Sequence, residues 1–400
     1  MDRRAFLTRS LALGCSLAAS PLVTPVALAQ GPWDARLVVI VLRGGLDGLD
    51  VIRPIGDPDL ARLRPRLMET AGLGLNDGWA LHPGLSGLRP LWDAGQFGAL
   101  HATSSPYRGP RSHFDAQDVL EAGTFPAGES RSGWLNRMLG IVPGMTAETA
   151  YSVGYEQMKI LSGTNPYLQW SPRSELDLSP QSRRLLDLIL HDDPIFRDAA
   201  LRAVDIADTL FTEATSDAED AGADGEMGMM MAPAPTRGHA GVAAFAAQRL
   251  RAETRIASFS LHGWDTHSRQ DIQLNGALEN LAETILTLRD GLGPVWDRTA
   301  VLCMTEFGRT AHENGTLGTD HGTGGAMLFA GGALRGGQVL GRWPGLAEAD
   351  LFDRRDLMPT SDVRAAAGRV MQDLFGLSRG DIEDTIFPGL DMTDAPRLAV

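Results

Sequence analysis

Apolar runs that end at glycine or polar residues recur along the chain, and they predict buried strands. The clearest is RLVVIVLRGG at 36–45, a continuous β-branched run stopped by glycines, which is typical of a strand covered on both faces. The runs at 97–105 and 255–267 end in polar residues in the same way, and further runs occupy 299–307 and 325–332. We therefore expect these segments to form one sheet.

Helical periodicity appears between and after these runs. Within 271–292 the apolar residues are spaced four, three, four and three apart, which places them on one face of a helix; they are Leu274, Leu278, Leu281, Ile285 and Leu288. The segment 361–377 predicts a closing helix with Ser361 or Asp362 as its N-cap. Because strands alternate with helices, we expect an α/β fold with a mainly parallel sheet and helices on both faces.

One stretch, 212–241, has no periodicity and is acidic, then rich in methionine, then rich in proline and alanine. We interpret it as a disordered surface insertion. The alternative is a soft-metal site, because thioethers favour Cu(I); its ligands would be Met227, Met229, Met230, Met231 and His239.

The amino-terminal segment 1–29 predicts a twin-arginine export signal. Paired arginines, Arg3 and Arg4, precede a weakly apolar stretch, and Ala27-Leu28-Ala29 forms a cleavage site before Gln30. We expect the twin-arginine translocase as a partner during export, a periplasmic or secreted location, and a single domain over 30–400 with no membrane span.

Charge and cysteine content limit the partners and the means of stabilisation. The net charge is −14 for the whole chain and, without the three arginines and one aspartate of the signal, −16. An acidic chain of this kind argues against nucleic acid as a partner. Cys303 is the single cysteine after the signal, so no internal disulfide is expected there.

Polar clusters come directly after the predicted strands, where ligands bind in parallel α/β folds. Carboxylate and imidazole together suit divalent metals such as Zn²⁺, Mn²⁺ or Mg²⁺, and two such ions can hold a phosphate or sulfate ester. A structural alternative is that Glu306 pairs with Arg309 and that His321 is a turn residue. The clusters contain Arg43, Asp47, Asp50, Ser112, His113, Asp265, His267, Glu306, Arg309, Asp320 and His321.

Several motifs together resemble the exported bacterial family known as domain of unknown function 1501: DRRAFL, VVIVLRGGLDGLD, RSHFDAQD, GWDTH, TEFGRT and GTDHGTGGAMLFAGG. That family is similar to the alkaline phosphatase and sulfatase superfamily. The resemblance implies a doubly wound, mainly parallel α/β fold that binds one or two divalent metals at the carboxyl ends of its strands.

The resemblance also assigns roles to residues. Asp265, His267 and His321 would hold one metal. Asp47 and Glu306, with Ser112 or Asp320, would form an oxygen-only second site that suits Mg²⁺ or Ca²⁺. By this resemblance Ser112 would be the nucleophile. The residues themselves suit Ser112 as either a helix cap or a nucleophile. They also predict His113 as a catalytic group that orients the site rather than binding metal, and Arg309 as a catalytic group that neutralises the oxygens of an oxyanion. Phe307 stands where the superfamily usually has a histidine.

These predictions support two functions. The favoured one is an exported metal-dependent hydrolase acting on a phosphate or sulfate ester of a small molecule or polymer. The alternative is a catalytically reduced domain of the same fold that serves as a periplasmic binding or assembly component, which the loss of the histidine at Phe307 favours.

Overall fold

The computed structural model describes residues 33–126, 131–142, 144–154, 156–171 and 238–400. The export signal at 1–29 and residues 212–237 of the irregular segment lie outside the described residues, and so do the four methionines of the soft-metal alternative. The remaining residues of that segment are described, and helix α9 (His239–Arg251) begins among them. The export signal, the insertion and the single domain over 30–400 stay predictions.

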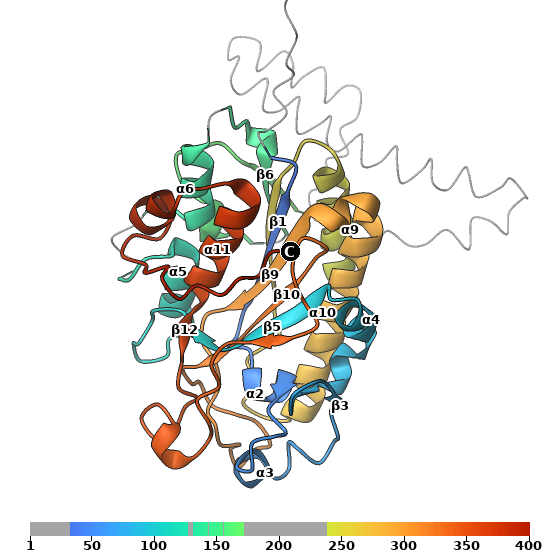
Figure 1. Cartoon of the computed structure of the whole chain (residues 1–400), viewed down its shortest axis with the longest axis vertical. Helices are drawn as coiled ribbons and strands as arrows, with labels where there is room; N and C mark the ends of the chain where they lie inside the picture. Colours follow the sequence, from blue (N-terminus) through green and yellow to red (C-terminus); the bar gives the residue numbers. More distant parts are fainter. Residues whose placement is uncertain (1–32, 127–130, 143, 155, 172–237) are drawn as a thin grey trace, which may run out of the picture.

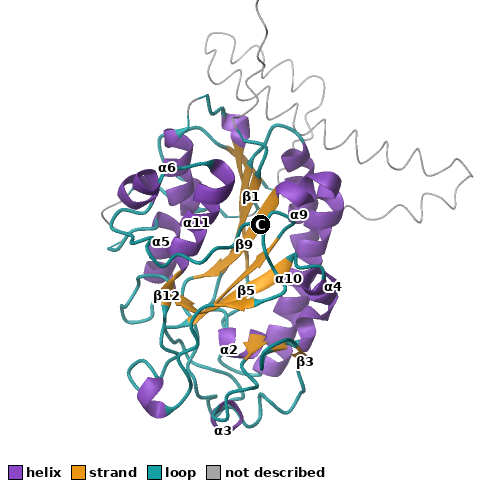
Figure 2. Cartoon of the chain, viewed as in Figure 1, coloured by secondary structure: helices purple, strands orange, loops and turns teal. Residues whose placement is uncertain are grey.

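A nine-stranded sheet forms the centre of the molecule (Figures 1 and 2). Its order is β11-β5-β10-β9-β1-β8-β6-β7, with β12 also paired to β5. All pairings are parallel except those of β10, which runs antiparallel to β5 and β9. The strands are β1 (Arg36–Leu42), β5 (Phe97–Ser104), β6 (Ala150–Val153), β7 (Leu168–Trp170), β8 (Ile256–Leu261), β9 (Thr299–Thr305), β10 (Gly325–Ala330), β11 (Val339–Leu340) and β12 (Ser361–Asp362).

Helices cover both faces of the sheet (Figure 1). One face carries α4 (Arg89–Asp93), α9 and α10 (Gln270–Leu292), and the other carries α5 (His113–Ala122), α6 (Trp134–Ile141) and α11 (Val363–Phe375). Alternate residues of β1 enter the two apolar cores: Val38 and Ile40 pack on the α10 side, and Leu37 and Val39 on the α11 side. The predicted α/β architecture is confirmed. Asp362 caps α11 by accepting a hydrogen bond from the amide of Arg364.

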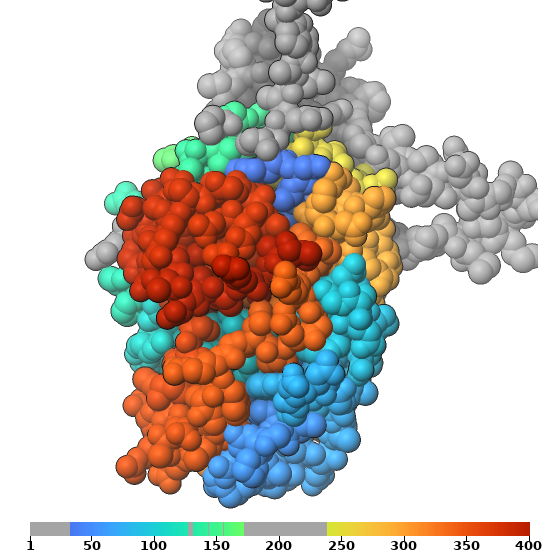
Figure 3. Space-filling view, in the orientation of Figure 1, coloured from blue at the N-terminus to red at the C-terminus, as the bar shows by residue number. Residues whose placement is uncertain are grey.

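Smaller elements surround the lower end of the sheet as drawn in Figure 1. There the early and late parts of the chain lie side by side, blue beside orange in Figure 3, and the indole of Trp343 donates to the carboxylate of Asp57. The short elements of the molecule, at this end and elsewhere, are α2 (Gly48–Val51), β2 (Ile52–Arg53), α3 (Leu60–Leu63), β3 (Leu73–Gly74), β4 (Ala80–Leu81), η2 (Pro83–Leu88), η4 (Ala147–Thr149), η5 (Lys159–Leu161), η7 (Gly293–Arg298), η8 (Glu348–Asp350) and the π-helical η9 (Asp381–Ile386).

The sheet topology brings distant segments to one edge. Because β1, β5, β8 and β9 are parallel, their carboxyl ends lie at the same edge, and the amino end of antiparallel β10 joins them. The loops after β1, β8 and β9, the start of α5 and the loop before β10 therefore meet there. In the part of the chain that the structure describes, no helix has the length and apolar character needed to cross a membrane.

Candidate metal centre

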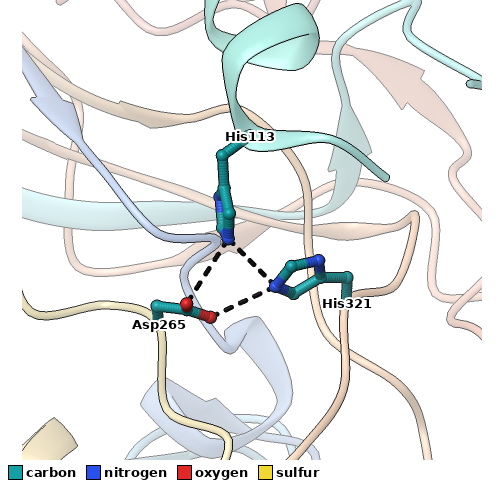
Figure 4. Close-up of side chains that lie close together, drawn as sticks. All are labelled: His113, Asp265 and His321. Carbon is teal, nitrogen blue, oxygen red and sulfur yellow. Dashed lines mark hydrogen bonds and ion pairs between the residues drawn. The ribbon is translucent and has the colours of Figure 1, made fainter. Parts of the chain in front are cut away.

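Three imidazoles and one carboxylate converge at this edge. The Nε2 atom of His321 lies 2.9 Å from Nε2 of His113 and 2.9 Å from Nε2 of His267. Asp265 completes the cluster: its Oδ1 lies 3.2 Å from Nε2 of His321 and 3.1 Å from Nε2 of His267, and its Oδ2 lies 3.5 Å from Nε2 of His113. Figure 4 shows the side chains of His113, Asp265 and His321 pointing toward one another. A tetrahedral zinc site with bonds of about 2.0–2.1 Å has ligand atoms about 3.3 Å apart, close to the separations among His113, Asp265 and His321, whose donor atoms all lie within 4.8 Å of one another.

The other ring nitrogen of each histidine is held by an acceptor. The Nδ1 atoms of His113 and His267 face the carboxylates of Glu306 and Asp320 at 2.9 and 3.3 Å. The Nδ1 atom of His321 lies 3.0 Å from the carbonyl oxygen of Arg111, which can only accept a hydrogen bond. Neutral imidazoles in these positions carry their proton on Nδ1, so their Nε2 lone pairs point at one another. In this tautomer the neighbouring lone pairs repel, and a bound cation relieves the repulsion. A proton serves one contact, whereas a divalent metal can accept the donor atoms of His113, Asp265 and His321 together.

Glu306 is fully buried directly after β9 and orients His113. Its Oε1 accepts from the amide of Gly44, 2.8 Å away, from Gln117 and from His113. Burial alone would raise the pKa of Glu306, but these hydrogen bonds outweigh it and hold the pKa below its usual value. Gly44 approaches so closely, at a φ of +127°, that a Cβ there would lie 2.4 Å from the amide nitrogen of Asp265; glycine is therefore required.

The pKa of His113 is shifted upward, and the pKa values of His321 and Asp265 are shifted downward. The hydrogen bond to Glu306 raises the pKa of His113. Burial lowers the pKa of His321, and the charge of Arg309 lowers it further. Burial would raise the pKa of Asp265, but the bond from Arg309 outweighs it and the pKa is lowered. The lowered pKa values of Asp265 and His321 favour the ionised carboxylate and the neutral imidazole, which are the forms that bind a cation.

Arg309 does not reach the solvent side of the cluster. It is 1% exposed, and its nitrogens donate to the carbonyl oxygens of Gly44, Gly45, Trp264 and Thr319 and to Oδ1 of Asp265. The expectation that Arg309 acts as a catalytic group facing an oxyanion therefore does not fit: its donors are already used to position Asp265.

The predicted second, oxygen-only site is not brought together. Asp47 is buried and its Oδ2 accepts from Arg64 and Gln270, 2.7 and 2.6 Å away. Glu306 and Asp320 instead lie within hydrogen-bond distance of His113 and His267. The hydroxyl of Ser112 accepts from the amide of Asp115 as the N-cap of α5, one of its two predicted roles; its role as a nucleophile stays a prediction.

The structure thus brings Asp265, His267 and His321 close together and adds His113, which was expected only to orient the site. The residues whose donor atoms all meet are His113, Asp265 and His321. Sequence reasoning also missed Gln117, although its position four residues after His113 places both on one face of α5. Phe307, at the position of the missing histidine, packs against the rings of His113 and His321, with ring centroids 4.9 Å apart in both cases. It fixes ring positions and offers no ligand.

Replacing Glu306 with glutamine is expected to weaken zinc binding about 10- to 100-fold at neutral pH, because such partners raise the basicity of ligand histidines. The affinity of the wild-type protein should fall as the pH drops through the raised pKa of His113. In the variant that fall should begin at lower pH, because the group that raises this pKa is gone. Zinc titrations by calorimetry between about pH 5 and about pH 8 measure both effects, with Glu313→Gln, a carboxylate bound to Arg66, as the control. Equal affinities for Glu306→Gln and the wild type would contradict the assignment.

Comparison with known proteins places the chain in a family and gives distant structural likenesses. The family model described as a protein of unknown function (DUF1501) matches residues 102–386. No curated protein matches the chain.

Solved structures with some likeness include a protein in the alkaline phosphatase superfamily from Vibrio parahaemolyticus, with 12% identity, a TM-score of 0.34, and coverage of 85% of this chain and 71% of that one. The C-terminal periplasmic domain of EcEptC from Escherichia coli has 9% identity, a TM-score of 0.33, and coverage of 74% and 72%. BT1596, a 2-O GAG sulfatase, has 9% identity, a TM-score of 0.33, and coverage of 77% and 66%. Overlaps of this extent say nothing about the chemistry of this chain.

Proposed function

The chain belongs to DUF1501, a family of proteins of unknown function, and we propose that it is a metal-dependent hydrolase with one divalent ion at the His113, Asp265, His267 and His321 cluster. The observation that carries this proposal is the convergence of three Nε2 lone pairs and a carboxylate, with each Nδ1 held by an acceptor. Imidazole nitrogens beside a single carboxylate favour Zn²⁺, or Mn²⁺, over Mg²⁺ and Ca²⁺, which prefer oxygen ligands. The sequence predicts one or two divalent ions, and we propose one.

The cluster is open enough for a substrate. The side chains of Asp265 and His267 are 48% and 44% exposed, and a hollow of about 560 Å³ adjoins Asp265 and is lined by Arg43, His262, Ile272 and the first turns of α10. A divalent ion held by His113, Asp265 and His321 would keep a fourth position open. There it would polarise an ester and make water acidic enough to attack it at neutral pH. The chain itself orients the ligands through Glu306, Asp320 and Arg309.

A positive charge beside His321 favours an anionic ester. Arg111 and Arg355 both pair with the buried carboxylate of Asp356, at 2.9 and 2.8 Å, so the three groups carry one net positive charge. The carbonyl of Arg111 holds Nδ1 of His321, and Arg355 donates to the carbonyl of His321 at 3.0 Å. Both guanidinium groups are partly exposed, 32% and 40%. Arg111 and Arg355, rather than Arg309, are therefore the groups that could hold phosphate or sulfate oxygens.

Metal analysis and a substrate panel test this function together. We expect about one zinc ion per chain and metal-dependent cleavage of a phosphate or sulfate ester, abolished by a chelator and restored by Zn²⁺ or Mn²⁺. A protein that binds no metal, or that cleaves no ester when loaded, would refute the hydrolase. In keeping with the segment 1–29, we also propose that the protein acts after twin-arginine export; a periplasmic form that begins at Gln30 on amino-terminal sequencing tests this.

A binding or assembly role without catalysis is the second candidate. The favouring observation is that the Asp47 carboxylate is already bonded to Arg64 and Gln270. Among the described residues, a single group of potential metal ligands comes together, namely His113, Asp265 and His321. One metal bound tightly with no turnover across the panel would support this role.

A further inference from the structure

A buried hydrogen-bond network lies next to the metal centre. The side chain of Gln270, the first residue of α10, is fully buried. Its Oε1 accepts from the hydroxyls of Thr266 and Thr319, 2.9 and 2.8 Å away. Its Nε2 donates to Oδ2 of Asp47 and Oδ2 of Asp50, 2.6 and 2.8 Å away. All four hydrogen-bonding positions of the amide are therefore used.

The two threonines lie on the two loops that carry metal ligands. Thr266 stands between Asp265 and His267, on the loop after β8, and Thr319 stands two residues before His321, on the loop before β10. Two backbone bonds run between the same loops: the amide of Thr319 donates to the carbonyl of Thr266, and the amide of Gln270 donates to the carbonyl of Leu317. Neither threonine hydroxyl touches solvent, since both residues are fully buried.

Asp47 anchors this network to a third loop. Its Oδ2 accepts from Arg64 as well as Gln270, and Arg64 in turn donates to the carbonyls of Thr310 and Ala311, at the start of the segment that leads to His321. We propose that Gln270 is a positioning residue, which sets the separation of the loops bearing Asp265, His267 and His321 and thereby the affinity of the metal centre. The effect on metal rests on the proposed function; the effect on the loops does not.

Threonine-to-valine variants test the network with little change of shape. Thr319→Val and Thr266→Val each remove one hydroxyl donor to Gln270, and Gln270→Met removes all four bonds. The matched control is Thr284→Val, also fully buried and on α10, whose hydroxyl donates to the carbonyl of Asn280. Thr319→Ser, which keeps the hydroxyl, should behave like the wild type.

Hydrogen exchange of the metal-free full chain gives the first readout. We expect exchange at the amides of Thr319 and Gln270 to accelerate about tenfold or more in Thr319→Val and Gln270→Met, and to stay unchanged in Thr284→Val. Unchanged protection in the network variants, or equal loss in the control, would overturn the proposal even where zinc binds.

Zinc affinity and the absorption spectrum of the Co²⁺-substituted protein give the second readout. We expect the network variants to bind zinc about 10-fold more weakly with an altered Co²⁺ spectrum, and Gln270→Met combined with Thr319→Val to lose less than the sum of the two. A wild type that binds no metal would refute the metal centre, while the exchange data would still decide whether Gln270 joins the loops. Zinc affinities that match the wild type despite faster exchange would overturn the positioning role.

Discussion

Replacing His321 with alanine is expected to lower zinc affinity more than 100-fold, beyond the roughly 10- to 100-fold effect of changing a residue that only orients a ligand. Its Nε2 is the atom that the cluster shares, 2.9 Å from both other imidazoles and 3.2 Å from Asp265. Without it, His113 and His267 keep their carboxylate partners but no longer meet through a common neighbour. Calorimetry and metal analysis of the purified variant measure the loss.

His312→Ala is the matched control for this variant. His312 lies on the same loop after β9, nine residues before His321, and its side chain is exposed. The control should bind one zinc ion with the affinity of the wild type. If His321→Ala binds zinc as tightly as His312→Ala does, the cluster is not the metal centre. If both variants lose zinc binding, the loop rather than the His321 imidazole is responsible.

The positions of the clustered residues along the sequence are explained by strand periodicity. Continuous apolar runs mark β1, β8 and β9, and parallel strands bring the loops at their carboxyl ends to one edge, so the sequence by itself groups Asp265, His267 and Glu306. His321 joins them because β10 starts at the same edge. That β10 runs antiparallel could not be predicted, because its apolar run has the same pattern in either direction.

The roles of the same residues depend on contacts that no local pattern contains. Asp47 comes after a strand just as Asp265 does, yet it is neutralised by Arg64, at the end of the four-residue helix α3, which has no periodicity to mark it. Arg309 points inward and donates hydrogen bonds to four carbonyl oxygens. This orientation depends on how tightly the loops after β1, β8 and β9 pack. His113 is the opposite case: the rotation of α5 about its axis turns Nε2 into the cluster, and contacts of α5 with Phe307 and Glu306 help to fix that rotation.

Because Asp47 forms a buried ion pair with Arg64, Arg64→Met should destabilise the protein by about 3–5 kcal/mol. Arg64 and Asp47 are 0% and 1% exposed and 2.7 Å apart. Removing the guanidinium leaves a buried carboxylate whose Oδ1 already has no hydrogen-bond partner among the described residues, and it also frees the carbonyls of Thr310 and Ala311. Urea unfolding of the metal-free protein, followed by circular dichroism, measures the change in free energy.

Arg62→Met provides the comparison, because Arg62 lies on the same helix and pairs with Asp59 on the surface, where its side chain is 58% exposed. An exposed pair of this kind contributes about 0–1 kcal/mol. Adding Asp47→Asn to Arg64→Met removes the unpaired charge and should recover part of the lost stability. If Arg64→Met costs no more than Arg62→Met, Asp47 is not held as a structural anion. Its carboxylate would then be free for a second cation, in line with the oxygen-only site that the sequence predicts.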